Sequence, residues 1–319
     1  MRGEQDREPL RLAIHPQRRI EEFGIRRPGS DVGSYYNRNT RRFLLAGHGG
    51  RQLAIHRAVW GPGVECREQA IEYVNELILA ELERATPPGD RPPRVADLGC
   101  GVGGSLIYLG SRMQASLVGA TISAVQADLA RAYVRERGLP DIEVVEADFT
   151  ADEFWRAYDD EPVDAAFAVE SFIHIEDARS TLRAIAARLQ PGGRLIVVDD
   201  MVSRTGARRG PDRRERRWLR EFEKGWHAHG LVSLEQLVAA GVQAGLVLDE
   251  VRDLTPYLEL DRPRDLLARG FMALVRWWPV RPAWFDNLLG GNALQLALKR
   301  RLLGYYYVVF TVGDSRTSA

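Results

Sequence analysis

The sequence has few cysteines, no long apolar run and no excess charge, and each shortage excludes a class of protein. Its 319 residues contain two cysteines, Cys66 and Cys100, too few for a disulfide framework or a cysteine zinc site. Lys plus Arg and Asp plus Glu number 44 each, which argues against a general nucleic-acid binder. No apolar run approaches the ~20 residues that span a bilayer, and the N-terminus lacks an apolar signal core. We therefore expect a cytoplasmic protein with no nucleic-acid or membrane partner, and a homo-oligomer stays open.

Strand and helix patterns alternate over most of the chain, which is typical of an α/β fold with a parallel sheet and helices on both faces. Apolar residues at helical spacing predict helices over Glu68–Glu83 and Ser233–Ala244. Between the first of these and the next strand, residues 86–93 are rich in Pro and Gly and end the helix. The predicted strands are Arg94–Leu98, Ser116–Ala120, Ile142–Glu146, Val163–Val169, Arg194–Val198, Leu246–Arg252 and Tyr305–Val312.

The segment RVADLGCGVGGSLIYLG, residues 94–110, joins a short apolar strand to a helix through a run of glycines. Glycine lets the backbone turn sharply and approach a ligand where a Cβ would clash. Asp97 precedes the glycines, so the order D-L-G-C-G-x-G-G differs from the G-x-G-x-x-G of dinucleotide sites. The pattern predicts a nucleoside site at the end of this strand. The alternative is that Asp97 and the glycines only make a tight turn, with Cys100 as a small residue in it.

This pattern resembles the first motif of class I S-adenosylmethionine-dependent methyltransferases, and the resemblance covers about residues 90–200. GATISAVQ (119–126) is similar to the G-x-T-x-S-x-x-Q version of sterol, tocopherol and prenyl C-methyltransferases. EADF (146–149), AVESFIHIED (168–177) and LQPGGRLIVVDD (189–200) follow in the family's order. The chain is most similar to prenyl (geranyl) diphosphate C-methyltransferases. The resemblance implies a Rossmann-like α/β fold, with a mostly parallel seven-stranded sheet and a helical cap.

The resemblance also implies S-adenosylmethionine as the cofactor. Gly99 and Gly101 would admit its methionine portion, and Asp148 would accept a hydrogen bond from the adenine amino group. Many class I enzymes place an acid at the end of the second strand for the ribose, whereas this chain has Thr121 and Ile122 there. The implied cofactor-binding residues are Tyr36, Asp97, Gly99, Gly101, Thr121, Ser123, Gln126, Asp148, Phe149 and Glu170.

Two segments exceed what the sheet needs, and we expect them to form the cap together with residues 31–66. Residues 202–232 carry a dense Arg run, whose charges we expect on a solvated helix face. Residues 254–304 place about fifty residues between the last two strands, far more than a simple connection. The expected organisation is an N-terminal arm and cap (1–66), the cofactor-binding core (67–201), a cap insertion (202–232), core (233–253), a helical cap insertion (254–304), and a final strand with a tail (305–319).

The reaction implied by the resemblance is methylation of an alkene carbon. The π bond attacks the methyl group and leaves a carbocation, from which a carboxylate must then remove a proton. Glu170 is the predicted base, because it follows the fourth strand where open α/β sheets place their ligands. His174 lies one helical turn later and is the second catalytic candidate. The alternatives are that Glu170 only binds cofactor or pairs with an Arg, and that His174 is structural.

The early segment SYYNRNTRRFLLAGHGGRQLAIHRAVWGPG, residues 34–63, resembles the N-terminal region of the same C-methyltransferase branch. It implies an isoprenyl diphosphate acceptor, geranyl diphosphate first among them, with Mg²⁺ bound alongside the diphosphate and its protein ligands unassigned. Trp218 and Phe222 fall on one face of a cap helix, which covers either core or substrate. The predicted substrate-binding residues are Tyr35, Asn37, Arg41, His56, Trp60, Trp218 and Phe222.

Two other functions fit the same sequence. A methyltransferase of a neutral prenylated or indolic secondary metabolite would keep Glu170 and the aromatic cap without needing the N-terminal Arg and Tyr donors. A cofactor-binding regulatory or scaffold protein would keep the glycine motif and have no use for Glu170.

Overall fold

The protein is described from a computed structural model that covers residues 33, 36, 37, 40, 53, 56–86, 89, 91–156, 162–260 and 283–313, without the side chains of residues 153, 283 and 284. The arm expected over residues 1–30 lies outside this part of the chain. So do Tyr35 and Arg41, two of the predicted substrate-binding residues.

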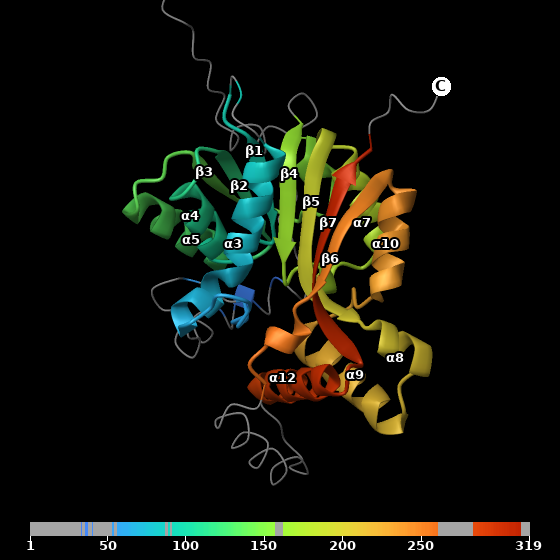
Figure 1. Ribbon diagram of the computed structural model, residues 1–319. Coiled ribbons are helices and arrows are strands. Elements are labelled where there is room, and N and C mark those ends of the chain that lie inside the picture. The colour runs from blue at the N-terminus through green and yellow to red at the C-terminus, as the bar shows by residue number, and fades with distance from the viewer. Residues whose placement is uncertain are drawn as a thin grey trace, which may run out of the picture.

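A seven-stranded sheet with strand order β3-β2-β1-β4-β5-β7-β6 forms the centre of the molecule (Figure 1). All neighbouring strands are parallel except β7, which runs antiparallel to both β5 and β6. This is the predicted Rossmann-like methyltransferase fold. The strands are β1 (Arg94–Leu98), β2 (Ser116–Thr121), β3 (Ile142–Glu146), β4 (Val163–Val169), β5 (Leu189–Val202), β6 (Leu246–Asp253) and β7 (Leu303–Val312).

Helices cover both faces of the sheet because its strands are apolar on both sides. Along β5, Leu195 and Val197 face one layer while Ile196 and Val198 face the other, as the alternation of a strand requires. One layer contains α6 (Asp152–Arg156), α7 (Ala178–Ala186) and α10 (Leu234–Gln243). The other contains α3 (Arg67–Ala85), α4 (Gly104–Gly110) and α5 (Ala124–Glu136).

Helices α9 and α12 lie together beyond the carboxyl end of β4 (Figure 1). They are joined to the sheet because β5 and β7 continue past it, pairing as far as Val202 with Leu303. A Cβ on Gly225 of α9 would lie 2.3 Å from the carbonyl oxygen of Asp286 on α12, so the two helices touch through their backbones. This region contains α8 (Arg204–Arg209), α9 (Arg213–Trp226), α12 (Ala283–Lys299) and the short turns η1 (Phe172–His174) and η2 (Thr255–Tyr257).

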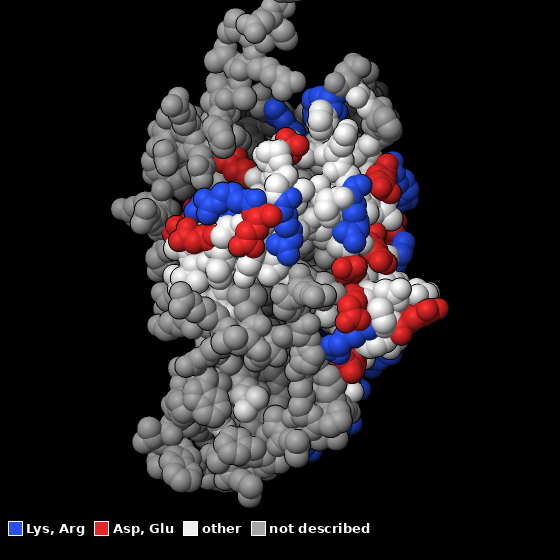
Figure 2. Space-filling model, turned by 90° about the vertical axis from the view of Figure 1, so that its left-hand side faces the viewer, with Lys and Arg blue, Asp and Glu red and all other residues white. Residues whose placement is uncertain are grey.

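The charged surface follows the even balance of the sequence. Figure 2 shows basic and acidic side chains interspersed on the face that it presents, among the residues that the structure describes. On α9, the arginines 213, 214, 216, 217 and 220 are exposed while Trp218 and Phe222 are buried, so the Arg run is the expected solvated face. In the described residues, none of the helices combines the length and apolar character needed to cross a bilayer.

Candidate active site

The turn after β1 is left-handed at three glycines, with φ values of 103° at Gly99, 55° at Gly101 and 84° at Gly103. Other residues rarely adopt this conformation, which explains the glycine spacing of the motif. The neighbouring strand fixes the turn, because the amides of Gly99 and Cys100 both donate to the carbonyl of Ala120. A Cβ on Gly99 would lie 2.5 Å from Cβ of Ser171, so the turn also touches the segment after β4. Residues distant in sequence therefore meet at the carboxyl ends of β1 and β4.

Asp97 is buried beside this turn, with 3% of its surface exposed. No described residue donates a hydrogen bond to its carboxyl group, and burial alone raises its pKa well above the usual range. A buried carboxylate without donors is costly, so a ligand that brings a donor or a positive charge would relieve it. Cys100 packs against Gly119, and burial raises the pKa of its thiol, which fits a small inert residue in the turn.

The residues predicted to lie near the ribose form one hydrogen-bonded group after β2. The hydroxyl of Thr121 donates to Oε1 of Gln126 at 2.8 Å, and Oγ of Ser123 accepts from the amide of Gln126 at 3.2 Å. Asn37 from the N-terminal segment joins them, because its Oδ1 accepts from the Ser123 hydroxyl at 2.6 Å and the Val125 amide at 3.3 Å. The structure thus places Asn37, predicted to bind substrate, with the cofactor candidates.

Asp148 and Phe149 follow β3, as expected for the adenine side. One carboxylate oxygen of Asp148, Oδ1, accepts from the amide and hydroxyl of Thr150 at 2.9 and 2.7 Å. Phe149 stacks on Phe172 with ring centroids 6.2 Å apart. These contacts hold both side chains at the carboxyl edge of the sheet, where the adenine ring would lie by the resemblance.

Glu170 follows β4 directly and lies in a buried charged cluster. Its Oε1 accepts from the Arg57 amide and the Tyr305 hydroxyl, both at 3.0 Å, and lies 3.5 Å from Nε of Arg57. Arg57 in turn donates from Nη1 to Oδ1 of Asp200 at 2.8 Å and from Nη2 to its other oxygen. Its guanidinium also lies 4.6 Å from the ring centroid of Tyr305. Glu170 is thus held by donors from two distant segments.

The backbone at Glu170 is left-handed, with φ of 52°, which is uncommon for a residue with a side chain. The amide of Glu170 donates to the Val198 carbonyl at 2.8 Å, so β5 fixes the position of this turn. Strain of this kind costs on the order of 1–3 kcal/mol and concentrates at functional sites. The hydrogen bonds and the ion pair of the Glu170 side chain hold its backbone in this left-handed conformation.

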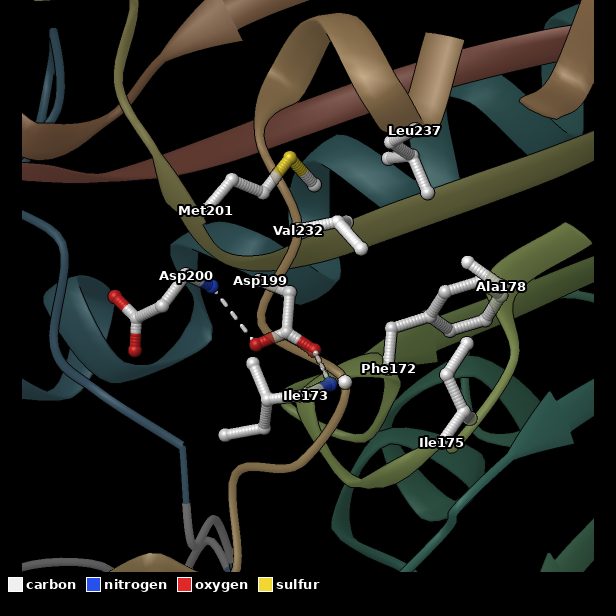
Figure 3. Close-up of a pocket in the computed structure, with 10 residues that line it drawn as sticks. Phe172, Ile173, Ile175, Ala178, Asp199, Asp200, Met201, Val232 and Leu237 are labelled. Atoms are coloured by element: carbon white, nitrogen blue, oxygen red, sulfur yellow. Dashed lines mark hydrogen bonds between the residues drawn. The ribbon is translucent and has the colours of Figure 1, made fainter. Parts of the chain in front are cut away.

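The side chains of Asp199 and Asp200, successive residues of β5, point in different directions (Figure 3) and contact different groups. The Asp199 carboxylate accepts from the amides of Ile173 and Asp200 at 3.1 and 2.8 Å, which fixes the turn that carries His174. Burial raises the pKa of Asp199 well above its usual range. Burial also raises the pKa of Asp200, against the opposing charge of Arg57. Asp199 lines a cavity of about 10 Å³, the space of about one water.

His174 is fixed on both ring nitrogens. Its Nδ1 lies 3.2 Å from the carbonyl of His227, an acceptor only, so Nδ1 carries the hydrogen. Its Nε2 therefore accepts the hydrogen bond from the Tyr36 hydroxyl at 2.8 Å. Burial lowers the pKa of His174 to about 4, which keeps the ring neutral at ordinary pH. The contact joins the N-terminal segment to the turn after β4.

His56 and Trp60 lie on a strip of chain that crosses the same edge of the sheet. Val59 bridges to Leu258, and the Trp60 amide donates to the Tyr257 carbonyl at 2.7 Å. Trp60 is 36% exposed. His56 is close enough to Glu170 for that charge to raise its pKa, although burial lowers the pKa by more.

Comparison with known proteins agrees with the fold. Residues 95–193 match a family model described as a methyltransferase domain. Methyltransferase GfsG of Streptomyces halstedii is 39% identical over 179 residues, 55% of this chain and 59% of that protein. O-methyltransferase cnsE of Penicillium expansum is 30% identical over 173 residues, 53% of this chain and 58% of that protein. The chain thus spans less than two thirds of the length of these relatives.

A solved geranyl diphosphate methyltransferase, in complex with geranyl diphosphate and sinefungin, has the same fold with a TM-score of 0.62. It is 18% identical, with 88% of this chain and 98% of that chain aligned. At that identity the likeness concerns the fold alone. The matches and the sheet topology agree. Residues 95–193, which match the methyltransferase family model, lie within a sheet that has the strand order of the methyltransferase fold.

Trp218 and Phe222 belong to a different group of side chains from the charged cluster. Both are buried where α9 meets α12, in contact with apolar residues that include Ile173 and Leu298. Two uses were predicted for this aromatic face, covering core or covering substrate, and its contacts within the described residues are with an apolar core between α9 and α12. Among the described residues, no group of three or more His, Cys, Asp or Glu is placed to hold a metal.

Sequence reasoning missed Arg57, Asp200 and Tyr305, which contact Glu170 or its partner. Arg57 lies inside the early segment that was singled out, yet its neighbours His56 and Trp60 were named instead. Asp200 ends a recognised motif, and an acid at the end of a buried strand was the available signal. Tyr305 had no signal, because it is one of three consecutive tyrosines in strand β7.

Proposed function

We propose that this chain transfers the methyl group of S-adenosylmethionine to a hydroxyl oxygen of an uncharged small secondary metabolite. The observation that carries the cofactor assignment is the left-handed glycine turn beside the donorless carboxyl group of Asp97. The oxygen acceptor is supported by relatives such as cnsE, which is named an O-methyltransferase. Because the chain spans only part of these relatives, the activity is proposed for the chain and not carried over from them.

The residues around the turn suit this cofactor. S-adenosylmethionine supplies an electrophilic methyl group on a sulfonium, and its methionine portion carries a positively charged amino group. Asp97 offers the acceptor that the amino group needs. Gln126, Asp148 and Phe149 line the following strand ends for the ribose and adenine. The carboxylates of Glu170 and Asp200 add negative charge at the place where a sulfonium would lie.

The charge of the cluster favours an uncharged acceptor. Around Glu170 the described residues contribute three carboxyl groups, those of Glu170, Asp199 and Asp200, and one guanidinium that is already paired. An acceptor with a diphosphate would bring up to three negative charges into this partly dry site, where like charges repel strongly. A neutral metabolite meets no such cost.

The second candidate is the reaction expected from the sequence, methylation of an alkene carbon of an isoprenyl diphosphate with Glu170 as base. One observation favours it: every hydrogen bond that the Glu170 side chain accepts from a described residue goes to Oε1, which leaves Oε2 able to take a proton. This reaction would need Mg²⁺ or other cations to offset the diphosphate charge, and Arg41 and Tyr35 are the predicted contacts.

An acceptor panel separates the two candidates. Purified protein would be given S-adenosylmethionine with geranyl diphosphate, geraniol or resorcinol, each with Mg²⁺ and with EDTA. Geraniol carries both a hydroxyl and alkenes, so NMR of its product distinguishes an O-methyl from a C-methyl group. O-methylation of geraniol or resorcinol in EDTA supports the first candidate. Mg²⁺-dependent C-methylation confined to geranyl diphosphate would establish the second instead.

Asp97→Asn tests the cofactor site. Removing the charge should weaken S-adenosylmethionine binding about 10- to 100-fold by calorimetry, as expected for one charge-assisted hydrogen bond. The ligand-free protein should become more stable at pH 7, because burial raises the pKa of Asp97 and the folded state then holds an unpaired charge. The exposed Asp128→Asn is the matched control and should change neither quantity. Unchanged affinity in Asp97→Asn would reject Asp97 as a cofactor contact.

The remaining expectations from the sequence stay predictions. These are the cytoplasmic location, the oligomeric state, and the division into core and cap. We assign α8, α9 and α12 to the cap, within the segments 202–232 and 254–304 that the sequence predicts for it.

A further inference from the structure

One buried nitrogen in the charged cluster has no partner. Nε2 of His56 is shielded from solvent, and no described residue forms a hydrogen bond with it. The other ring nitrogen, Nδ1, lies 3.3 Å from the carbonyl of Arg57. A carbonyl only accepts, so Nδ1 carries the hydrogen and Nε2 keeps its lone pair. A buried lone pair without a donor is costly, and a ligand that brings a hydroxyl hydrogen would satisfy it.

The neighbours of His56 suit a group that gains and loses a proton. Glu170, which follows β4, acts on His56 by its charge, and Arg57 adjoins His56 in sequence. These two side chains in turn bind Tyr305 of β7 and Asp200 of β5. Burial lowers the pKa of His56 while the Glu170 charge raises it. The ring is therefore neutral near pH 7, and the nearby carboxylate stabilises the imidazolium once a proton arrives. A neutral histidine beside a carboxylate is the usual arrangement of a general base.

The other groups of the site are less suited to accept the proton. Nε2 of His174 already accepts from the Tyr36 hydroxyl, and burial lowers the pKa of that ring to about 4. Burial raises the pKa of Tyr305 well above its usual range, so its hydroxyl stays a donor to Glu170. Glu170 has Oε1 occupied by donors, and its charge acts on His56, so for methylation of a hydroxyl we assign it the role of stabilising the His56 imidazolium.

We propose that Nε2 of His56 accepts the proton of the acceptor hydroxyl during methyl transfer. This proposal rests on the proposed function. A lone pair of the acceptor oxygen forms the new C–O bond, the bond between methyl carbon and sulfur breaks with its electrons staying on sulfur, and the O–H proton moves to Nε2. The products are a methyl ether, a neutral thioether and an imidazolium, which returns its proton to water after release.

The first test needs no turnover. NMR of the full chain labelled with ¹⁵N-histidine, bound to S-adenosylhomocysteine, reports the tautomer and titration of each of its six histidines. The His56 signals are assigned by their loss in His56→Asn. We expect the Nδ1–H tautomer and a titration below pH 6.5. A hydrogen on Nε2, or a ring charged at pH 7, would overturn the proposal even if the protein binds cofactor normally.

The second test uses methylation of geraniol and resorcinol. His56→Asn should keep S-adenosylmethionine affinity while turnover falls about 10²- to 10⁴-fold. Glu170→Gln should move the acidic limb of the pH profile to lower pH, because it removes the charge that raises the pKa of His56. His229→Asn, on an exposed histidine outside the cluster, is the control. Full turnover in His56→Asn would overturn the proposal, whereas absent cofactor binding in the unmodified chain would contradict the proposed function instead.

Discussion

At the scale of single residues, the charged cluster shows what a sequence can and cannot reveal. Glu170 could be found because it follows a recognisable strand inside a recognisable motif. Its partners could not, because Arg57 lies 143 residues before Asp200 and Tyr305 lies 135 residues after Glu170. No spacing rule connects such positions, and only the fold brings them together. The same holds for Asn37, whose contact with Ser123 spans 86 residues.

The pair of Arg57 and Asp200 gives a prediction at this scale. The Asp200 side chain is fully buried, so Arg57→Leu leaves a buried carboxylate without its counter-charge. We expect a loss of about 3–5 kcal/mol in the free energy of unfolding, measured by chemical denaturation. Arg57→Leu with Asp200→Leu should recover most of the loss, since neither charge remains. The exposed pair of Arg204 and Glu235 is the control, and Arg204→Leu should cost less than about 1 kcal/mol. Equal losses in the two Arg variants would contradict this account.

At the scale of elements, local patterns predicted the sheet well. The predicted strands Arg94–Leu98, Ile142–Glu146 and Val163–Val169 coincide with β1, β3 and β4, because each is a short apolar run bounded by polar or glycine residues. The strand predicted at Arg194–Val198 is shorter than the observed strand β5, which extends to Val202. That extension depends on pairing with the start of β7, about a hundred residues later, so no local signal could give it.

The contact between helices α9 and α12 gives a second prediction. Gly225 of α9 and Gly291 of α12 both lie inside helices, where alanine is favoured over glycine by about 1 kcal/mol. A Cβ on Gly225 would lie 2.3 Å from the backbone of α12, whereas one on Gly291 would meet only Trp226 at 3.7 Å. Gly225→Ala should therefore lower the thermal midpoint, and Gly291→Ala should hold or raise it. Equal responses in a thermal melt would mean that the close approach of the two helices does not contribute to stability.

At the scale of the whole molecule, buried titratable groups act on stability in opposite directions. Burial raises the pKa of Asp97, Asp199 and Asp200, so these groups bind protons more tightly when folded and favour the folded state as the pH falls. Burial lowers the pKa of His56 and His174, and these groups have the opposite effect. The pH dependence of stability in the intact chain is the sum of the aspartate and histidine contributions. A plot of unfolding free energy against pH therefore cannot by itself assign the effect to either set of residues.

Replacing His174 isolates its contribution to the pH dependence of stability. With a pKa of about 4 when folded and 6.5 when unfolded, His174 takes up a proton mainly on unfolding as the pH falls through this window. The folded state should lose about 2 kcal/mol between pH 6.5 and 5 from this group, at 1.36 kcal/mol per pH unit. His174→Gln cannot charge, while its side-chain oxygen can still accept from Tyr36. Denaturation at pH 7 and pH 5 should show a smaller acid loss in His174→Gln than in the unmodified chain. The same acid loss in His174→Gln would mean that His174 is protonated in the folded state, and its hydrogen bond from Tyr36 would then be absent in solution.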